Sequence, residues 1–184
     1  MYYILESREH ALVGMISYPN SGWGMHFTKG SLLDPSFGEG QIYVEFESNH
    51  DIIPDYFELS ATPVVSERFV QQLKTIPLDN YQLFPVTIKM PEGQVTGHYI
   101  FNVVGRVSCI DVVASDTKKF KNKIMRMNKM VLKEDFTEEL QLFRSDEYPL
   151  PIFISEKTKE GLEASSLSGM LINPAVGWSD KHRF

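Results

Sequence analysis

Five carboxylates follow one another between residues 45 and 58, and no lysine or arginine interrupts them: Glu45, Glu47, Asp51, Asp55 and Glu58. Paired carboxylates can act as general acid and base in a hydrolase, or can bind a divalent cation. Their spacing is not that of a calcium-binding loop. We interpret them as an acidic patch that attracts a basic partner protein and speeds its association. Two alternatives are kept. The chain could be a small hydrolase with a carboxylate site, or the carboxylates could be ordinary exposed residues of a strand and a turn.

The other candidate catalytic groups lack the neighbours that their chemistry needs. Cys109, the single cysteine, would need a base such as His98, and its apolar mid-strand position predicts a small buried hydrophobe. Gly22-Trp23-Gly24 lacks the third glycine and the helix of a phosphate-binding loop. No histidine forms a recognised zinc pattern with another ligand residue; the five are His10, His26, His50, His98 and His182. We therefore predict no catalytic residue, no metal site and no cofactor, and the chain is not expected to be an enzyme.

A basic run extends from Lys118 to Lys133, with no acidic residue inside it. Its cations are Lys118, Lys119, Lys121, Lys123, Arg126, Lys129 and Lys133. Methionine and phenylalanine are interleaved with them, a composition that can bind nucleic acid or an anionic surface. The next segment is acidic, however, and adjacent runs of opposite charge are more often a solvated surface that neutralises itself. We favour that interpretation and keep a nucleic-acid or anionic-surface adaptor as the alternative function.

The length, composition and net charge of the chain limit the class of protein. A chain of 184 residues, 42% of them hydrophobic, can bury a core as one domain. The 18 basic and 24 acidic residues give a net charge of −6, which argues against nucleic acid as the default partner. No stretch resembles a secretory signal or approaches the roughly 20 apolar residues that span a bilayer. With only one cysteine, a reducing compartment fits best, so we expect a cytoplasmic protein without a membrane partner.

The longest β-rich run, Tyr99 to Ser115, is expected to form the centre of the fold. Apolar residues occupy its odd positions up to Cys109, which predicts a strand with one buried face and one partly wet face. The alternation then changes phase, and Gly105 is the expected place of a bend. Tyr81 to Met90 is the expected antiparallel partner, and Gln41 to Glu47 alternates as a half-buried strand.

Two segments share the pattern of a strand, a helix-capping serine and a short helix. Ser66 and Ser155 each follow an apolar stretch, precede a glutamate, and stand at equal distance from a later leucine. A serine oxygen at that place accepts from a free helix N–H, and the glutamate lies at the positive end of the helix dipole. The predicted fold class is α+β, with a mostly antiparallel central sheet and two short strand-cap-helix units packed around it, one on each side.

The segment from Tyr18 to Gly40 is rich in glycine and proline and is expected to be a long irregular loop. Its aromatic residues Trp23, Phe27 and Phe37 predict that the loop is held against the body of the protein. Because aromatic side chains in loops often anchor a partner, these three are also candidate contacts.

Nine short motifs, taken in their order along the chain, resemble a bacterial immunity-protein family that was first described as a domain of unknown function, of the immunity protein 11 type. Members of that family are linked to polymorphic toxins and contact-dependent antagonism. The resemblance extends from Pro54 to Pro174. The motifs are Pro54-Asp55-Tyr56, Val64-Val65-Ser66-Glu67, Leu83-Phe84-Pro85-Val86, Tyr99 to Val103, Cys109-Ile110-Asp111, Ser115, Leu142-Phe143-Arg144, Ile154-Ser155-Glu156 and Ser168-Gly169-Met170.

The resemblance implies a single immunity-type domain over 1–184, with a variable N-terminal part (1–53), a family-like core (54–174) and a tail (175–184). It also implies a function, which is to bind a cognate toxin domain and neutralise it by covering its active site. Such a protein needs no catalysis of its own. The expected partner is a basic toxin domain rather than nucleic acid or a membrane. The candidate contacts are Glu45, Glu47, Asp51, Asp55, Glu58, Trp23, Phe27 and Phe37.

Overall fold

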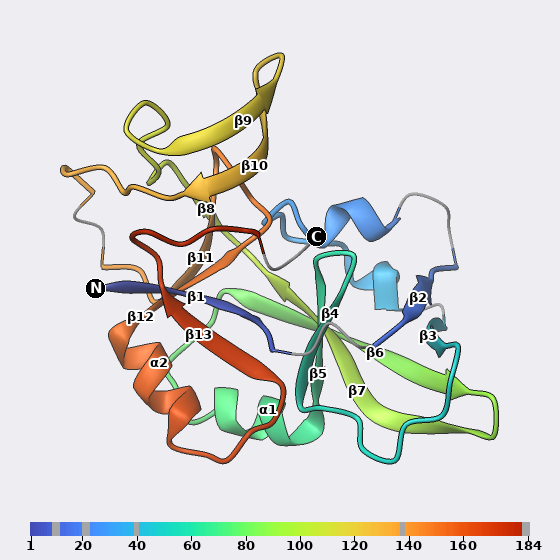
Figure 1. The fold of residues 1–184 in the computed structure, drawn as a ribbon. Helices are drawn as coiled ribbons and strands as arrows, with labels where there is room; N and C mark the ends of the chain where they lie inside the picture. Colours follow the sequence, from blue (N-terminus) through green and yellow to red (C-terminus); the bar gives the residue numbers. More distant parts are fainter. Residues whose placement is uncertain (9–11, 20–22, 39–40, 137–138, 182–184) are drawn as a thin grey trace.

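The strands of this chain form three sheets in the part that the structure, a computed structural model, describes: residues 1–8, 12–19, 23–38, 41–136 and 139–181 (Figure 1). The strands are β1 (Tyr2–Ser7), β2 (Gly14–Ser17), β3 (Ile42–Phe46), β4 (Tyr56–Leu59), β5 (Thr62–Ser66), β6 (Tyr81–Met90), β7 (Gly93–Val103), β8 (Arg106–Val107), β9 (Asp116–Phe120), β10 (Lys123–Lys129), β11 (Leu142–Ser145), β12 (Ile152–Ser155) and β13 (Met170–Pro174). The helices are α1 (Glu67–Leu73) and α2 (Glu156–Glu163), with 3₁₀ turns η1 (Trp23–His26) and η2 (Pro35–Gly38). One large sheet has the order β2-β3-β6-β7-β5-β4 and the other β13-β1-β12-β11-β8, while β9 pairs with β10 alone.

The chain is mainly β, so the α+β class predicted from the sequence is wrong. The described part of the chain has thirteen strands and only two α-helices. The helices have seven and eight residues, and helices this short offer little apolar surface, so the sheets supply most of the core. Two large sheets also replace the single central sheet of the prediction. Most of their neighbouring strands are antiparallel, whereas β3 with β6 and β8 with β11 are parallel.

Both faces of the six-stranded sheet are covered at the C-terminal end of β7, where neighbouring residues are buried on opposite sides. Phe101 belongs to a core shared with the five-stranded sheet and both helices. Ile100 packs with Phe84 of β6 in a second core on the other face. A third core lies on the outer face of the five-stranded sheet, where the rings of Phe143 and Phe153 stack 5.1 Å apart. The sheets are thus the middle layers of a molecule with three apolar cores.

The long loop before β3 covers one face of β7 at its C-terminal end, where Ile100 to Val103 are all buried. Among the even positions that the alternation predicts to be partly wet, Arg106 and Ser108 are exposed. Asn102 is instead fully buried, and its amide donates to the carbonyl of Ser31 (3.0 Å). Gln82 and Leu33 exchange two hydrogen bonds of 2.8 Å each. The loop therefore bonds to both side chains, although the buried Asn102 Oδ1 accepts no hydrogen bond from the described residues. The predicted position of the loop against the body is confirmed.

The chain passes from one large sheet to the other at Gly105. β7 ends two residues earlier, and β8 begins directly afterwards as the parallel partner of β11. Gly105 has a φ of +107°, a conformation that glycine adopts without steric cost. The side-chain amide of Asn80 fixes the crossing, since it donates to the carbonyls of Val104 (2.8 Å) and Leu142 (2.6 Å). The predicted bend is confirmed, but it joins two sheets instead of bending one strand pair.

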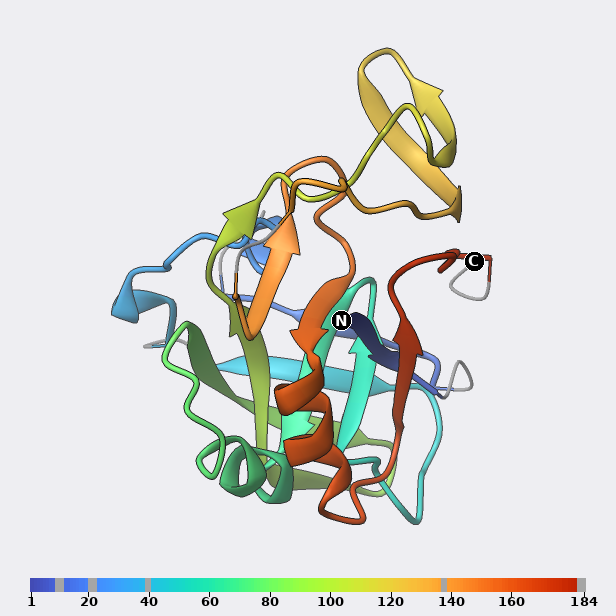
Figure 2. The same cartoon turned by 90° about the vertical axis from the view of Figure 1, so that its left-hand side faces the viewer.

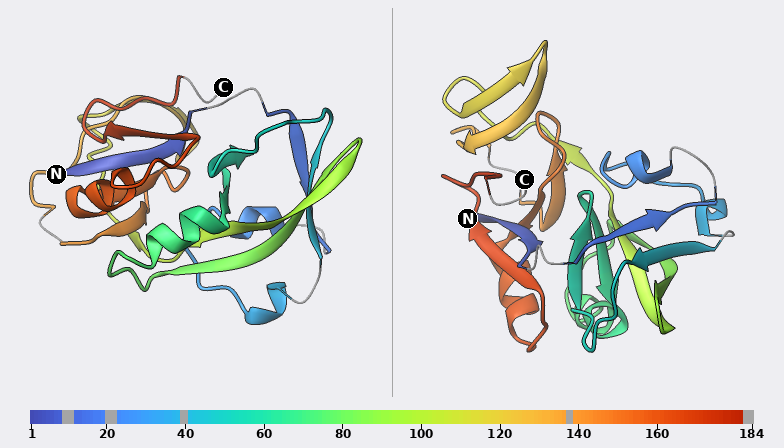
Figure 3. Two further views of the ribbon diagram at one scale, coloured as in Figure 1. Left: turned by 90° about the horizontal axis from the view of Figure 1, so that it is seen from below. Right: turned by 45° about the vertical axis from the view of Figure 1, so that its right-hand side comes forward.

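The two helices lie side by side beneath the sheets, and not on opposite sides of a central sheet as predicted (Figures 2 and 3). Gln72 of α1 donates to the carbonyl of Gly161 in α2 (2.6 Å). A Cβ atom at Gly161 would come within 2.7 Å of the Ile76 side chain. Glycine lowers the helix propensity of α2, but here it allows the close approach of the two segments.

The two predicted helix caps are confirmed. The Ser66 hydroxyl accepts from the N–H of Phe69, and the Ser155 hydroxyl accepts from the N–H of Thr158, each at 3.2 Å. Both serines have the extended backbone that a cap requires. Each cap thus turns the end of a strand directly into a helix.

Removing the two caps is expected to have unequal effects on stability. Ser155→Ala should lower the free energy of unfolding by about 1 kcal/mol, the usual contribution of a serine cap. Ser66→Ala should lower it by about 2 kcal/mol, because the Ser66 hydroxyl also donates to the buried carboxylate of Asp55 (2.6 Å). Urea unfolding of both variants measures the difference. Equal losses, or none, would contradict the capping geometry.

Candidate functional site

β3 presents the first carboxylates of the acidic segment on an open face of the six-stranded sheet. Glu45 lies directly opposite Met15 of β2 and Lys89 of β6. The Ser17 hydroxyl donates to Glu45 Oε2 (3.2 Å), and Lys89 Nζ lies 3.9 Å from Oε1. The same ammonium lies 3.3 Å from the ring centroid of Tyr43. Glu45 is therefore oriented by its neighbours while it stays partly open to solvent.

A shallow cavity of about 350 Å³ opens beside this carboxylate, lined by Gly14, Met15, Glu45, Phe46 and Glu47. Gly14 leaves room for the Phe46 ring, because a Cβ there would lie 2.7 Å from the ring carbon Cδ1. Met15 is 61% exposed beside it. An apolar group flanked by carboxylates matches the usual composition of a protein interface, with an apolar centre and a polar rim.

The loop after β3 carries the next two predicted carboxylates, and both Glu47 and Asp51 are exposed. The Asn49 side chain accepts from the backbone N–H of Glu92 (3.1 Å), which ties this loop to the turn between β6 and β7. Glu45, Glu47 and Asp51 are called the acidic face below. They are the part of the predicted patch that the structure leaves accessible.

Asp55 is buried and fully engaged within the protein. Its Oδ1 accepts from the Ser66 hydroxyl (2.6 Å), and its Oδ2 accepts from the N–H (2.9 Å) and hydroxyl (3.0 Å) of Ser168. Arg68 Nη1 adds an ion pair at 3.1 Å. Burial acts to raise the pKa of Asp55, but these hydrogen bonds and the guanidinium outweigh it, so the pKa lies below its ordinary value. The carboxylate joins α1 to the segment before β13.

Glu58 and the predicted aromatic anchors are also held inside the scaffold, as far as the structure describes them. The Tyr56 hydroxyl donates to Glu58 Oε1 (2.8 Å). Phe27 is fully buried against Phe84 (ring centroids 5.4 Å apart), so it anchors its own loop. Phe37 is half-buried in η2, and its ring lies 5.5 Å from that of His26. The side chain of Trp23 lies outside the described residues.

The Phe27 loop is fastened to the five-stranded sheet by a fully buried arginine on β11. Arg144 Nη2 donates to the carbonyl of Phe27 (3.2 Å), and Nη1 donates to those of Pro149 (2.9 Å) and Leu150 (2.7 Å). A guanidinium can serve several carbonyls at once because its donors form a fixed planar fork. Arg144 therefore joins three chain segments, a role of which no local sequence pattern is a sign.

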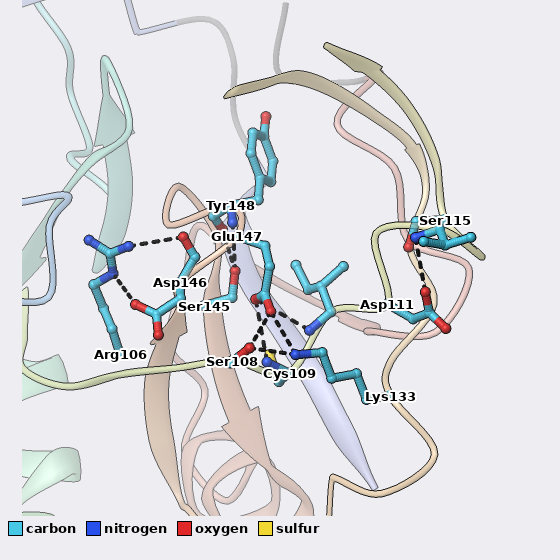
Figure 4. Close-up of polar contacts among 12 residues, drawn as sticks. Arg106, Ser108, Cys109, Asp111, Ser115, Lys133, Ser145, Asp146, Glu147 and Tyr148 are labelled. Atoms are coloured by element: carbon cyan, nitrogen blue, oxygen red, sulfur yellow. Dashed lines mark hydrogen bonds and ion pairs between the residues drawn. The ribbon is translucent and has the colours of Figure 1, made fainter. Parts of the chain in front are cut away.

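A second polar cluster, which sequence reasoning missed, lies where β8 ends (Figure 4). The Ser108 hydroxyl donates to Glu147 Oε1 (2.7 Å), and Lys133 contacts both the Ser108 hydroxyl and Glu147 (3.1 Å). Glu147 Oε2 also accepts from the N–H groups of Cys109 (3.3 Å) and Ile110 (3.4 Å). Ser108, Lys133 and Glu147 are 14 to 39 positions apart, so no local pattern could reveal them.

This cluster positions the backbone and does not activate a nucleophile. In a serine–lysine dyad a neutral amine takes the hydroxyl proton, whereas Lys133 here is an ammonium paired with Glu147. Burial acts to raise the pKa of Glu147, but hydrogen bonds from Ser108, Lys133 and backbone N–H groups hold it below its ordinary value. A carboxylate that stays ionised keeps the ion pair intact at neutral pH.

Cys109 is the small buried hydrophobe that its position predicts. It is fully buried, and burial together with the charge of Glu147 raises its pKa to about 12, so the thiol stays protonated and unreactive. Among the described residues, no group of three histidines, cysteines or carboxylates could hold a metal ion. In the same part of the chain, no helix has the length and apolar composition needed to span a membrane.

Comparison with known proteins decides the family. The model described as Immunity protein family (Imm11) matches residues 24–176. The chain belongs to this family. It is therefore an immunity protein of the kind associated with polymorphic toxins, and a toxin is its expected class of partner. No curated protein matches the chain. The Imm11 match begins before β3 and so includes the acidic face and the Phe27 loop.

Motifs that carried the Imm11 resemblance meet in space and build the scaffold. The N–H of Asp55 donates to the Ser168 hydroxyl (3.1 Å), and the N–H of Tyr56 donates to the Ser168 carbonyl (3.1 Å). Gly169 follows in the same turn with a φ of +82°. These contacts join β4, at the edge of one large sheet, to the start of β13 in the other. The family motifs in this junction therefore fix the fold, and the candidate contacts on β2 and β3 lie outside them.

Proposed function

We propose that this Imm11 protein neutralises its toxin by binding it through the acidic face and the neighbouring edge of β2, covering the toxin's active site without any catalysis of its own. The observation that carries this proposal is the cavity beside β3, where the exposed Met15 is flanked by Glu45 and Glu47. Val13, which is 56% exposed, precedes β2 and extends the apolar part. Sequence reasoning missed both apolar residues.

The chemistry of the site fits a basic cleft. Toxins that act on nucleic acids need cations to bind phosphates, and the carboxylates of the acidic face can occupy the same cations. Ser17 and Lys89 hold Glu45 in place before binding, which reduces the entropy lost on association. Met15 would supply apolar contact that slows dissociation. A stable complex of this kind buries about 800 Å² on each partner.

Charge reversal on the acidic face tests the proposal. In the variant E45K/E47K/D51K, association with the cognate toxin domain, sought in the neighbouring gene, should slow about tenfold at low salt. The midpoint of thermal unfolding should fall by only a few degrees, because two of the three side chains are exposed and the repulsion that E45K adds toward Lys89 is partly solvated. Surface plasmon resonance at two salt concentrations measures the rates.

A matched variant separates a local effect from one of total charge. Glu134, Asp135 and Glu139 are also exposed carboxylates, and E134K/D135K/E139K changes the net charge equally. We expect this control to bind at nearly the wild-type rate. Wild-type association by the acidic-face variant, or equal slowing by both variants, would remove the acidic face from the interface.

A further inference from the structure

β9 and β10 form an arm that projects from the body, and Figures 1 and 3 show it standing apart from both large sheets. Its cations are Lys118, Lys119, Lys121, Lys123, Arg126 and Lys129, and its single carboxylate is Asp116. The arm therefore carries a charge of +5 within a chain of net charge −6. Because the charges are segregated in this way, the acidic total says little about what the arm binds.

The register of the arm places cations on both of its faces and at its tip. Lys118 lies directly opposite Arg126, and Phe120 lies opposite Lys123, so these four share one face. Lys119 lies opposite Ile124 on the other face. Like charges directly opposite each other destabilise a strand pair. An anion bound beside Lys118 and Arg126 would offset this repulsion.

No carboxylate in the described part of the chain forms an ion pair with the lysines of the arm. Asp116 accepts from the Asn128 amide (3.2 Å). The acidic segment that follows was expected to neutralise the basic run, but its described residues Glu134, Asp135 and Glu139 make no ion pair with the lysines of the arm. These lysines are all exposed and present their positive charge to solvent.

The arm also exposes an aromatic ring among these cations. Phe120 is 66% exposed, and Lys121 Nζ lies 5.7 Å from its ring centroid. At the base of the arm, Met127 is fully buried, and its N–H donates to Asp180 (3.0 Å). An exposed ring on a rigidly based cationic ribbon is the combination that binds unpaired bases and their phosphates together.

We propose that the β9–β10 arm binds single-stranded nucleic acid, with the lysines contacting phosphates and Phe120 stacking on an unpaired base. A flat anionic membrane would engage only one face of the arm and leave Lys119 or Lys118 unused. A flexible strand can follow cations on both faces and around the tip at Lys121. This activity uses a surface other than the acidic face and does not depend on the toxin-binding proposal.

Fluorescence anisotropy with a labelled oligo(dT) of about 20 nucleotides tests the arm directly. We expect binding at low salt, and at least about tenfold weaker binding by K118Q/K119Q/K121Q/K123Q. The slope of log Kd against log salt concentration should fall by about 3 in this variant, since each phosphate contact contributes about 0.7. The charge-matched control K29Q/K74Q/K157Q/K181Q, whose lysines are exposed elsewhere, should bind as the wild type does.

The exposed ring gives a second, independent readout. F120A should bind the oligonucleotide about tenfold more weakly, whereas M125A, which alters another exposed apolar side chain of β10, should not. Neither F120A nor M125A should change binding to a duplex of the same length. The proposal is overturned if oligo(dT) does not bind at low salt, if the arm and control variants lose affinity equally, or if F120A has no effect. Binding to anionic vesicles but not to oligo(dT) would assign the arm to a membrane instead.

Discussion

Gly169→Ala is expected to lower the free energy of unfolding by about 3 kcal/mol or more, among the largest effects of any single methyl group in this protein. Gly169 has a φ of +82°, which costs any other residue about 1 kcal/mol. In addition, the new Cβ would overlap the carbonyl oxygen of Tyr56 and lie 2.6 Å from Pro54 Cβ. Since the carbonyl belongs to β4 and the glycine leads into β13, the junction between the two sheets must open to admit the methyl group.

Gly177 offers a matched control for the conformational cost of a positive φ. Its φ is +83°, almost the same as that of Gly169, but a Cβ there would meet nothing within 4 Å. Gly177→Ala should therefore cost about 1 kcal/mol, the conformational penalty alone. Urea unfolding of both variants at one temperature gives the comparison. If the two substitutions have the same cost, the close packing of Gly169 on β4 is not a source of stability.

Asp55→Asn is expected to lower the free energy of unfolding by about 3 kcal/mol at neutral pH, because it removes a buried charge that accepts from two serines and pairs with Arg68. The pKa of Asp55 is lowered in the folded state, so its ionised form stabilises the fold above the ordinary aspartate pKa of about 3.8. That contribution is lost as the pH falls through the folded-state pKa. The difference between wild type and variant should therefore be constant from pH 6 to 8 and shrink below about pH 4.

The exposed Asp51 provides the contrast. Asp51→Asn should change the free energy of unfolding by less than about 0.5 kcal/mol at every pH, since the side chain is exposed and no described residue bonds to its carboxylate. Chemical unfolding at pH 7, 5, 4 and 3 measures both variants. A pH-independent loss for Asp55→Asn would mean that the stabilisation comes from packing and not from the charge.

Elements defined by residues close in sequence could be predicted. The alternation in Tyr81 to Met90 and the turn after it gave the β6–β7 hairpin, and the Ser-Glu spacing gave both helix caps. The predicted α+β class is wrong because the two short helices, although correctly placed, are a small part of a chain whose strands form two large sheets. The prediction of a partly wet face agrees with the exposed Arg106 and Ser108 but is wrong at Asn102, because a loop about 70 residues earlier in the chain covers that side chain, which no periodicity reveals.

The same difference between local and distant contacts separates the candidate site residues that could be predicted from those that could not. Glu45 and Glu47 were expected to point outward from an alternating strand, and they lie at the open cavity beside β2. Asp55 belongs to the same acidic run, but its partner Ser168 is 113 residues away. The local sequence therefore could not predict that the Asp55 carboxylate is buried and bonded within the scaffold. Met15 was missed because one exposed methionine in a short strand looks like any core residue. The partner-binding role of the acidic face stays a prediction.

The position of β1 constrains when the fold can form during synthesis. β1 lies between β12 and β13, so Tyr3 has both Ile154 and Pro174 as cross-strand neighbours. Contacts between such distant residues form slowly, because a long loop must close before they stabilise anything. While the chain emerges from the ribosome, the first strand exposes unpaired edges until the last strand is made. The five-stranded sheet can therefore be complete only after translation has passed residue 174, and a chain that ends before β13 leaves one edge of β1 unpaired.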